Sequence, residues 1–264
     1  MKTIYACFPD GKHKVLTMSY DDGKEEDRRL VSIFNQHGIK GTFHVNAGIK
    51  DPSRVSQEDF KTLYEGHEVS CHTYTHPTIA RCPMEQVVHQ VLDDRIALEK
   101  IMEYPVRGLS YPNGSYSKEI MEVLPMLGIK YSRVVGSSNN FAMPTDLYKW
   151  QATCHHNTNL LKHGEAFISL FKKQYLYMMY VWGHSYEFTD KNNWEIMEDF
   201  CELVGNREDI WYATNIEIVD YLEAYNRLHF SGDCSFVYNP SIMSVWLSVD
   251  GEIVEVKGGQ QVSL

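Results

Sequence analysis

The chain of 264 residues carries 35 acidic and 25 basic side chains besides its histidines, which gives a formal net charge of −10. This length is enough to bury one large core, and we expect one main α/β domain rather than two separate units. The acidic balance and the lack of a basic stripe exclude nucleic acid and anionic membrane surfaces as expected partners, so a neutral substrate fits better.

No segment of the sequence is typical of a membrane span. The first ten residues contain no apolar run of signal-peptide length, and no later segment approaches the about eighteen apolar residues of a membrane helix. We therefore expect no membrane span and a cytoplasmic location, with an exported precursor as the open alternative.

From residue 14 onward, apolar runs typical of buried strands alternate with segments of helical periodicity. The predicted strands are residues 14–20, 41–45, 68–72, 106–111, 130–135, 175–182 and 210–214. The predicted helices are residues 25–37, 56–65, 83–102, 117–127, 193–204 and 215–228. Residues 137–159 show the least regular pattern. Strand followed by helix, repeated six or seven times, predicts a mostly parallel sheet that is closed or nearly closed on itself.

Several residues at the ends of these helices are typical of caps. Ser56 with Asp59 resembles a capping box, and Gly38 is an expected residue just past a helix end. Ser117 and Asn215 are expected N-caps, because their side chains can accept a hydrogen bond from the first turn.

Past residue 229 the pattern changes to short alternating runs. Residues 245–249 and 252–256 are predicted strands joined by Asp250 and Gly251, a pair typical of a type I′ hairpin turn. The end of the chain is therefore expected to be rich in β structure.

Two histidines four residues apart, His72 and His76, are placed to bind a metal ion. A catalytic zinc site has about three protein ligands and one open position for water, so this pair needs one more donor. Asp21 and Asp22 follow the first predicted strand, and adjacent carboxylates offer one oxygen ligand and one free carboxylate. That is the minimum for an activated water molecule beside a general base.

The two motifs together resemble the polysaccharide deacetylase family, also called the NodB-homology domain or carbohydrate esterase family 4. Residues 19–23 read Ser-Tyr-Asp-Asp-Gly where the family reads Thr-Phe-Asp-Asp-Gly, and residues 72–76 read His-Thr-Tyr-Thr-His where it reads His-Ser/Thr-x-x-His. The resemblance covers roughly residues 14–225 and implies the family's distorted (β/α)7 barrel, a TIM-barrel-like fold. We accordingly expect residues 1–228 to form the barrel and residues 229–264 a small β extension, which covers one barrel end or contributes to a dimer contact.

The resemblance implies a role for each polar residue of these motifs. Asp22, His72 and His76 would hold the metal ion, and Asp21 would be the base that takes a proton from water. His184 stands where the family's last motif, Leu-x-His, places the general acid, with a valine or tryptophan in place of the leucine. A histidine packed at a strand end is the alternative for His184, and a helix N-cap is the alternative for Asp21.

The family's third motif, Arg-x-Pro-x-Gly, is only partly present. Residues 110–114 read Ser-Tyr-Pro-Asn-Gly, with serine where the resemblance implies the arginine that orients the base. Tyr111, Pro112 and Asn113 are still expected beside the substrate, with a backbone N–H of Tyr111 or Asn113 helping to hold the oxyanion.

Four more side chains are candidates for the surroundings of the site. Arg107 or Arg133 would supply the missing cation if either reaches the base from a neighbouring strand. Residues 146–150 partly match the family's fourth motif, Asp-x-x-Asp-Trp, and Trp150 is either a sugar-stacking surface or a core residue. His155 is expected next to the metal ligands or on the substrate side.

Together these residues predict a metal-dependent amidohydrolase that removes an acetyl group, N-linked or O-linked, from an amino sugar or polysaccharide. Zn²⁺ is the expected ion, with Co²⁺, Ni²⁺ or Mn²⁺ as alternatives, and the expected partner is a carbohydrate or a small acylated amine. A homo-oligomer stays open. Two other functions also stay open: an amide hydrolase acting on a small or lipid-linked substrate, and a carbohydrate-binding pseudoenzyme, which the missing arginine slightly favours.

Overall fold

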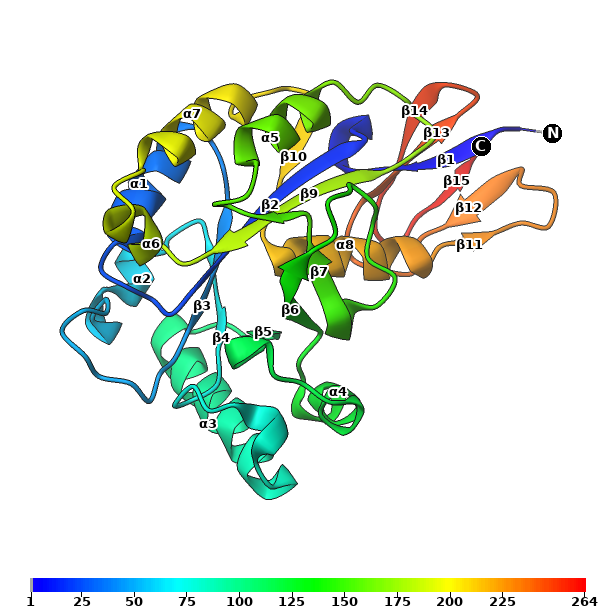
Figure 1. Ribbon diagram of the computed structural model, residues 1–264. Helices are drawn as coiled ribbons and strands as arrows, with labels where there is room; N and C mark the ends of the chain where they lie inside the picture. Colours follow the sequence, from blue (N-terminus) through cyan, green and yellow to red (C-terminus); the bar gives the residue numbers. More distant parts are fainter. Residues whose placement is uncertain (1) are drawn as a thin grey trace.

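The computed structural model describes residues 2–264 and shows one central, all-parallel sheet with helices outside it (Figure 1). The sheet order is β7-β6-β5-β4-β3-β2-β9-β8, with β10 added to the first half of β2. Apart from β7 and β8, its strands are β2 (Lys14–Asp21), β3 (Gly41–Val45), β4 (Glu68–Cys71), β5 (Gly108–Ser110), β6 (Tyr131–Ser137), β9 (Tyr177–Gly183) and β10 (Ile210–Tyr212). Each of these strands was predicted from apolar runs, and the predicted parallel α/β fold is confirmed.

A short segment within the region of least regular sequence closes the barrel. β7 (Trp150–Ala152) pairs with β6, and β8 (Cys154–His155) pairs with β9, so one stretch of chain bridges both edges of the sheet. Thr153 lies between the two strands, and its N–H donates to the Tyr180 carbonyl at 2.7 Å. The sequence did not predict these two strands, because their pairing depends on closure of the barrel rather than on a local pattern.

The helices cover the outside of the barrel (Figure 1). They are α1 (Asp27–Gln36), α2 (Phe60–Leu63), α3 (Met84–Met102), α4 (Lys118–Val123), α5 (Leu160–Ile168), α6 (Tyr186–Asp190), α7 (Glu195–Val204) and α8 (Asn215–Asn226). Of these, α5 and α6 were not predicted. Among residues 2–264, we find no helix that combines the length and the apolar character needed to cross a bilayer.

The predicted helix caps are partly confirmed. Ser117 accepts a hydrogen bond from the N–H of Ile120, as expected, but Ser56 makes no side-chain cap because its segment begins as a 3₁₀ turn. The N-cap of α8 is Thr214 rather than Asn215. The Asn215 side chain is instead buried inside the barrel, where its Nδ2 donates to the Tyr180 hydroxyl at 2.6 Å.

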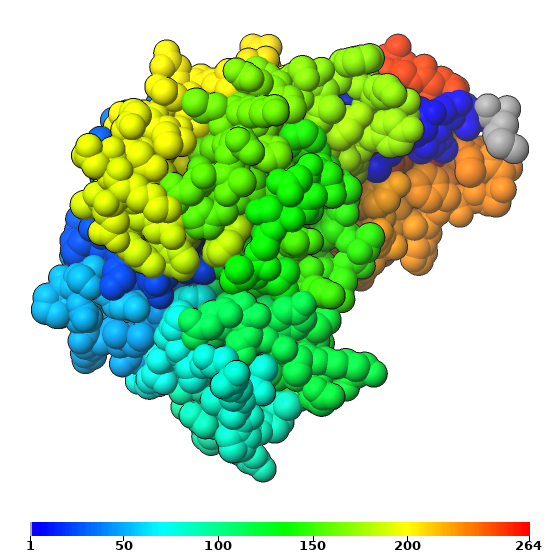
Figure 2. All heavy atoms as spheres, viewed as in Figure 1, coloured from blue at the N-terminus to red at the C-terminus, as the bar shows by residue number. Residues whose placement is uncertain are grey.

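The end of the chain forms two small antiparallel sheets. β13 (Val245–Val249) and β14 (Glu252–Val256) form the predicted hairpin, with positive φ at both turn residues, and β1 (Ile4–Cys7) pairs with β13. The second sheet contains β11 (His229–Phe230), β12 (Phe236–Tyr238) and β15 (Gln261–Ser263). Figure 2 shows these residues in orange and red beside the blue N-terminal segment. They pack near α8 and the turn before β2, so the carboxyl ends of the barrel strands stay uncovered by them.

Candidate active site

The metal-ligand candidates converge where β2 and β4 end. Asp22 follows β2 with a φ of 79°, and His72 follows β4. The Asp22 Oδ1 atom lies 4.0 Å from the Nε2 of His72 and 3.8 Å from the Nε2 of His76. One ligand atom from each residue lies within 4.8 Å of the other two. Carboxyl ends of parallel barrel strands meet at one face, which is why segments so far apart in the sequence come together.

The ring of His72 is held in the tautomer that a metal ligand needs. Its Nδ1 lies 2.9 Å from the Ser110 carbonyl oxygen, and because a carbonyl can only accept, Nδ1 carries the proton. Burial lowers the pKa of His72, so the ring is neutral at pH 7. Its Nε2 therefore presents a lone pair toward Asp22, the arrangement that outer hydrogen bonds impose on metal-binding histidines.

Hydrogen bonds from two side chains, Asn46 and Arg54, fix the loops that carry these ligands. Asn46 Nδ2 donates to the carbonyl oxygens of His72 at 2.6 Å and Thr73 at 2.8 Å. Arg54 donates to the Asp22 carbonyl and, at 2.9 Å, to the Asn46 side-chain oxygen. One arginine and one amide thus tie the loops after β2, β3 and β4 into a single frame.

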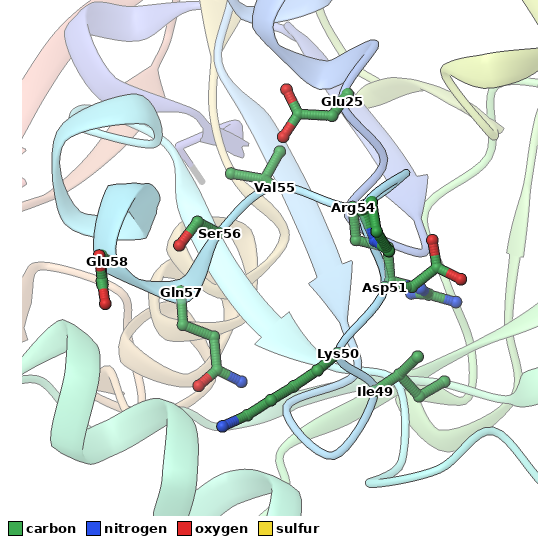
Figure 3. Close-up of a pocket in the computed structure, with 10 residues that line it drawn as sticks. Glu25, Ile49, Lys50, Asp51, Arg54, Val55, Ser56, Gln57 and Glu58 are labelled. Carbon is green, nitrogen blue, oxygen red and sulfur yellow. The ribbon is translucent and has the colours of Figure 1, made fainter.

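A hollow of about 520 Å³ lies on the loop after β3, next to this frame (Figure 3). Arg54 belongs to both, since it lines the hollow and contacts Asp22. The other polar lining groups include Lys50, Asp51 and Gln57, labelled in Figure 3.

Asp21 is a buried carboxylate with two polar side-chain partners. Ser110 Oγ donates to Oδ1 at 3.0 Å, and Arg133 Nη2 donates to Oδ2. Burial alone raises the pKa of Asp21, but Arg133 and the nearby histidines outweigh it, so the pKa lies well below its usual range. Of the two predicted candidates, Arg133 reaches Asp21, whereas Arg107 pairs with Asp220 at 2.7 Å.

His184 follows β9 and faces a carboxylate that the sequence did not point to, Glu187. The Nδ1 of His184 lies 3.5 Å from Glu187 Oε1. Burial lowers the pKa of His184, but Glu187, Asp21 and Asp22 outweigh it and raise the pKa above its ordinary value. No helix was predicted here, so the spacing His-x-x-Glu was the one available signal, because residues three apart are neighbours where a helix forms.

The remaining predicted residues lie in different surroundings. Trp150 is buried against Tyr131 and Tyr180, so the core alternative describes it and the sugar-stacking surface does not. Tyr111 is also buried, with its hydroxyl donating to the Tyr148 carbonyl at 2.9 Å.

Pro112 and Asn113 form a turn just after β5. Pro112 is buried, while Asn113 is exposed, has a φ of 57° and donates to the Thr78 hydroxyl at 3.2 Å. His155 lies 3.1 Å from Glu187 and thus joins the surroundings of His184 rather than those of the metal ligands. The roles predicted for Pro112, Asn113 and His155 toward substrate stay predictions.

Comparison with known proteins agrees with the motifs. The sequence model of the polysaccharide deacetylase family matches residues 9–132. The resemblance to the polysaccharide deacetylase family is confirmed. The Xyl-CE4 domain of a multidomain xylanase from the hindgut metagenome of Trinervitermes trinervoides has the same fold, with a TM-score of 0.57 at 12% identity over 80% of this chain and 92% of that one.

Two curated relatives each match a little under half of the chain. The chitooligosaccharide deacetylase of Rhizobium leguminosarum bv. phaseoli is 30% identical over 124 residues, which are 46% of this chain and 48% of that protein. The peptidoglycan-N-acetylglucosamine deacetylase PgdA of Listeria monocytogenes is 26% identical over 124 residues, 46% of this chain and 26% of that protein. The chain thus spans about half or less of the length of these relatives. The polysaccharide deacetylase match includes the metal-ligand candidates but ends just before Arg133 and well before His184.

Proposed function

We propose that this protein is a metal-dependent deacetylase that removes an N-linked acetyl group from an amino sugar. The observation that carries the proposal is the cluster of Asp22, His72 and His76 beside the buried carboxylate of Asp21. The names of both curated relatives refer to deacetylation of such sugars, in chitooligosaccharides and in peptidoglycan. Zn²⁺ is the proposed ion, because two imidazoles and one carboxylate are a common donor set of catalytic zinc.

The three ligands fit a divalent ion on their own chemistry. His72 offers an unprotonated nitrogen, and a set of three protein ligands leaves a position open for water or substrate. An ion held there would polarise the acyl carbonyl and lower the pKa of a water molecule. Asp22, held by Arg54, supplies the negative charge that balances the ion.

Asp21 is the proposed base and His184 the proposed acid. The Arg133 contact keeps Asp21 ionised, so its carboxylate can accept the proton of the attacking water. His184, with its raised pKa, is able to carry a proton for the leaving amine. The arginine missing from the third motif slightly favoured a pseudoenzyme, but Arg133 supplies a cation at Asp21 in its place.

The test is acetate release by the zinc-loaded protein from N-acetylated chitooligosaccharides, peptidoglycan fragments, small N-acetylated amines and a lipid-linked N-acetyl sugar. We expect release from the sugars, loss of release after chelation and recovery when Zn²⁺ is restored. Release that is indifferent to chelation, or none from any sugar by protein with bound metal, would overturn the proposal. The expected cytoplasmic location and a homo-oligomer stay predictions.

A further inference from the structure

A second cluster of polar groups lies around Glu187, apart from the metal-ligand candidates. Three nitrogens surround its Oε2 atom: Nε2 of His155 at 3.1 Å, Nε2 of His156 at 2.9 Å and Nδ2 of Asn157 at 3.0 Å. Asn157 is itself held, since its Oδ1 accepts from Asn193 at 3.1 Å. Two histidines and a carboxylate at such distances have the composition of a metal site. Their hydrogen bonds decide between a metal site and a cluster that holds no ion.

Those hydrogen bonds oppose a metal ion. The backbone N–H of Asn157 donates to the Nδ1 of His155 at 3.1 Å, so Nδ1 holds a lone pair and the proton of the neutral ring is on Nε2. A protonated Nε2 cannot bind a metal ion. Glu187 Oε2 is also engaged, because it accepts a hydrogen bond from Asn157 Nδ2 at 3.0 Å and the Nε2 atoms of His155 and His156 lie 3.1 and 2.9 Å from it.

His156 is a fixed neutral ring rather than a second charge. It stacks between Tyr20 and Phe188, with ring centres 5.7 and 4.1 Å away. It also fills the space beside Gly183, where a Cβ atom would lie only 2.1 Å from its Nδ1. Burial lowers the pKa of His156 to about 4, so it stays uncharged at neutral pH and contacts Glu187 as a neutral ring.

The occupied Oε2 leaves the other oxygen of Glu187 for His184. Oε1 lies 3.5 Å from His184 Nδ1, an ion-pair distance that can shorten when substrate binds. Burial raises the pKa of Glu187, but the three histidines outweigh it and hold the pKa far below its ordinary range. A full negative charge therefore faces His184, and the ring's Nε2 is the nitrogen left for substrate.

We propose that Glu187 is the positioning residue of His184, held by His155, His156 and Asn157 so that its free oxygen orients the imidazole and keeps a proton on it. This inference rests on the proposed function, in which His184 is the acid. The His184 Nε2–H proton passes to the leaving nitrogen, which takes the electron pair of the breaking bond to the acyl carbon. The ring becomes neutral and its Nδ1–H stays toward Glu187.

Other charged and titratable groups around His184 come from four elements. Asp21 and Asp22 at the end of β2 add negative charge, while Arg133 on β6 stacks over Trp182 at 4.4 Å and opposes it. Tyr186 on α6 has its ring 5.3 Å from that of His184. The remaining two are His155 of β8 and His156 just after it. Among residues 2–264, Glu187 is the group that combines a negative charge with direct contact to the His184 ring.

The experiment compares Glu187→Gln with Asp190→Asn, a matched control that removes one exposed carboxylate from the same helix. In the zinc-loaded enzyme, Glu187→Gln should lower kcat about 10-fold or more, as part of the about 10²- to 10⁴-fold that the acid contributes. The alkaline limb of its pH profile of kcat should move to lower pH by about 1 to 3 pH units, because the anion that favours charged His184 is gone. The metal content of Glu187→Gln should be unchanged, and Asp190→Asn should behave as wild type. Glu187→Asp, which keeps a carboxylate, should have its alkaline limb at the wild-type pH.

A second measurement does not depend on activity or on the variant folding. Histidine-labelled, zinc-loaded wild-type protein is titrated by NMR, and His184 should titrate above an ordinary histidine while His156 stays neutral. An ordinary or lowered value for His184, or an unmoved alkaline limb in folded Glu187→Gln, would overturn the inference. So would a second equivalent of bound Zn²⁺ that His155→Ala removes. Absence of acetate release in wild type would instead count against the proposed function alone.

Discussion

Two clusters of the same composition lie at the same end of this barrel, and their hydrogen bonds give them opposite chemistry. Each contains two histidines and one carboxylate whose ligand atoms lie within 4.8 Å of one another. The first contains Asp22, His72 and His76, and the second contains His155, His156 and Glu187. Composition and proximity alone would assign a metal ion to both.

The two clusters differ in the backbone group that contacts the Nδ1 atom of one of their histidines. His72 Nδ1 faces a carbonyl oxygen at 2.9 Å, which leaves Nε2 bare for a metal ion. His155 Nδ1 faces a backbone N–H at 3.1 Å, which places the proton on Nε2 and turns that atom into a donor. The backbone group behind a histidine thus decides whether its outer nitrogen accepts a metal or gives a hydrogen bond.

Removing one histidine from each cluster should give the largest difference between the two clusters, in the amount of bound metal. His72→Ala or His76→Ala should reduce bound Zn²⁺ from about one per chain to none and abolish acetate release, since too few of the about three ligands of a catalytic site remain. The His155→Ala variant should keep the Zn²⁺ ion that is bound at the first cluster. Elemental analysis after dialysis decides the matter, and metal retained in both first-cluster variants would contradict the site.

Substitutions of Asp22 in the first cluster and of its chain neighbour Asp21 should have different effects. Asp21→Asn should keep the metal and lower kcat by about 10²- to 10⁴-fold, because the base is gone. Asp22→Asn should mainly weaken metal binding, since a neutral amide replaces a charged ligand. Metal titration and acetate release on both proteins test this, and full activity in Asp21→Asn would place the base elsewhere.

A smaller effect is expected from the arginine that holds the base. Arg133→Met should lower the free energy of unfolding by about 3–5 kcal/mol, because it leaves Asp21 buried and unpaired. Arg107→Met is the control: its Asp220 pair is about a third exposed, and such surface pairs contribute only about 0–1 kcal/mol. Urea unfolding of the two metal-free variants measures the difference, and equal losses would show that burial does not matter here.

The same pair should affect acid unfolding. The folded-state pKa of Asp21 lies below its unfolded value, so its stabilisation is present above the unfolded value and is lost as pH falls toward the folded one. Wild-type stability should therefore decline in strongly acidic solution, and Arg133→Met should show less of this decline. A pH series of unfolding midpoints tests the sign.

The sequence could predict the parts of this structure that depend on local pattern. The strand that ends at Asp21 and the hairpin around Asp250 could be predicted, because apolar periods and turn residues are local signals. β7 and β8 could not, since their pairing partners are set by closure of the barrel. Arg133 stayed undecided because both faces of a barrel strand are buried, so alternation cannot tell inside from outside. Glu187 is ordinary in the sequence and becomes functional only through three-dimensional neighbours.

The smallest expected effect concerns Ser110, which contacts both the base and the metal ligand. Its hydroxyl donates to Asp21 at 3.0 Å and lies 2.6 Å from His72 Nδ1, but the proton of Nδ1 is also held by the Ser110 carbonyl. Ser110→Ala keeps that carbonyl, so metal affinity should stay at the wild-type level. The lost hydrogen bond to Asp21 should cost about 1 kcal/mol, which is about a fivefold lower kcat.

Ser110→Thr keeps the hydroxyl and serves as the matched control, with activity close to wild type. The pair of variants separates backbone from side chain in setting the tautomer of His72. If Ser110→Ala lost its Zn²⁺, the hydroxyl rather than the carbonyl would be holding the ring, and the contrast with His155 would no longer follow from backbone groups. If metal is retained and only kcat falls, the carbonyl behind His72 and the N–H behind His155 are sufficient to give the two clusters their different chemistry.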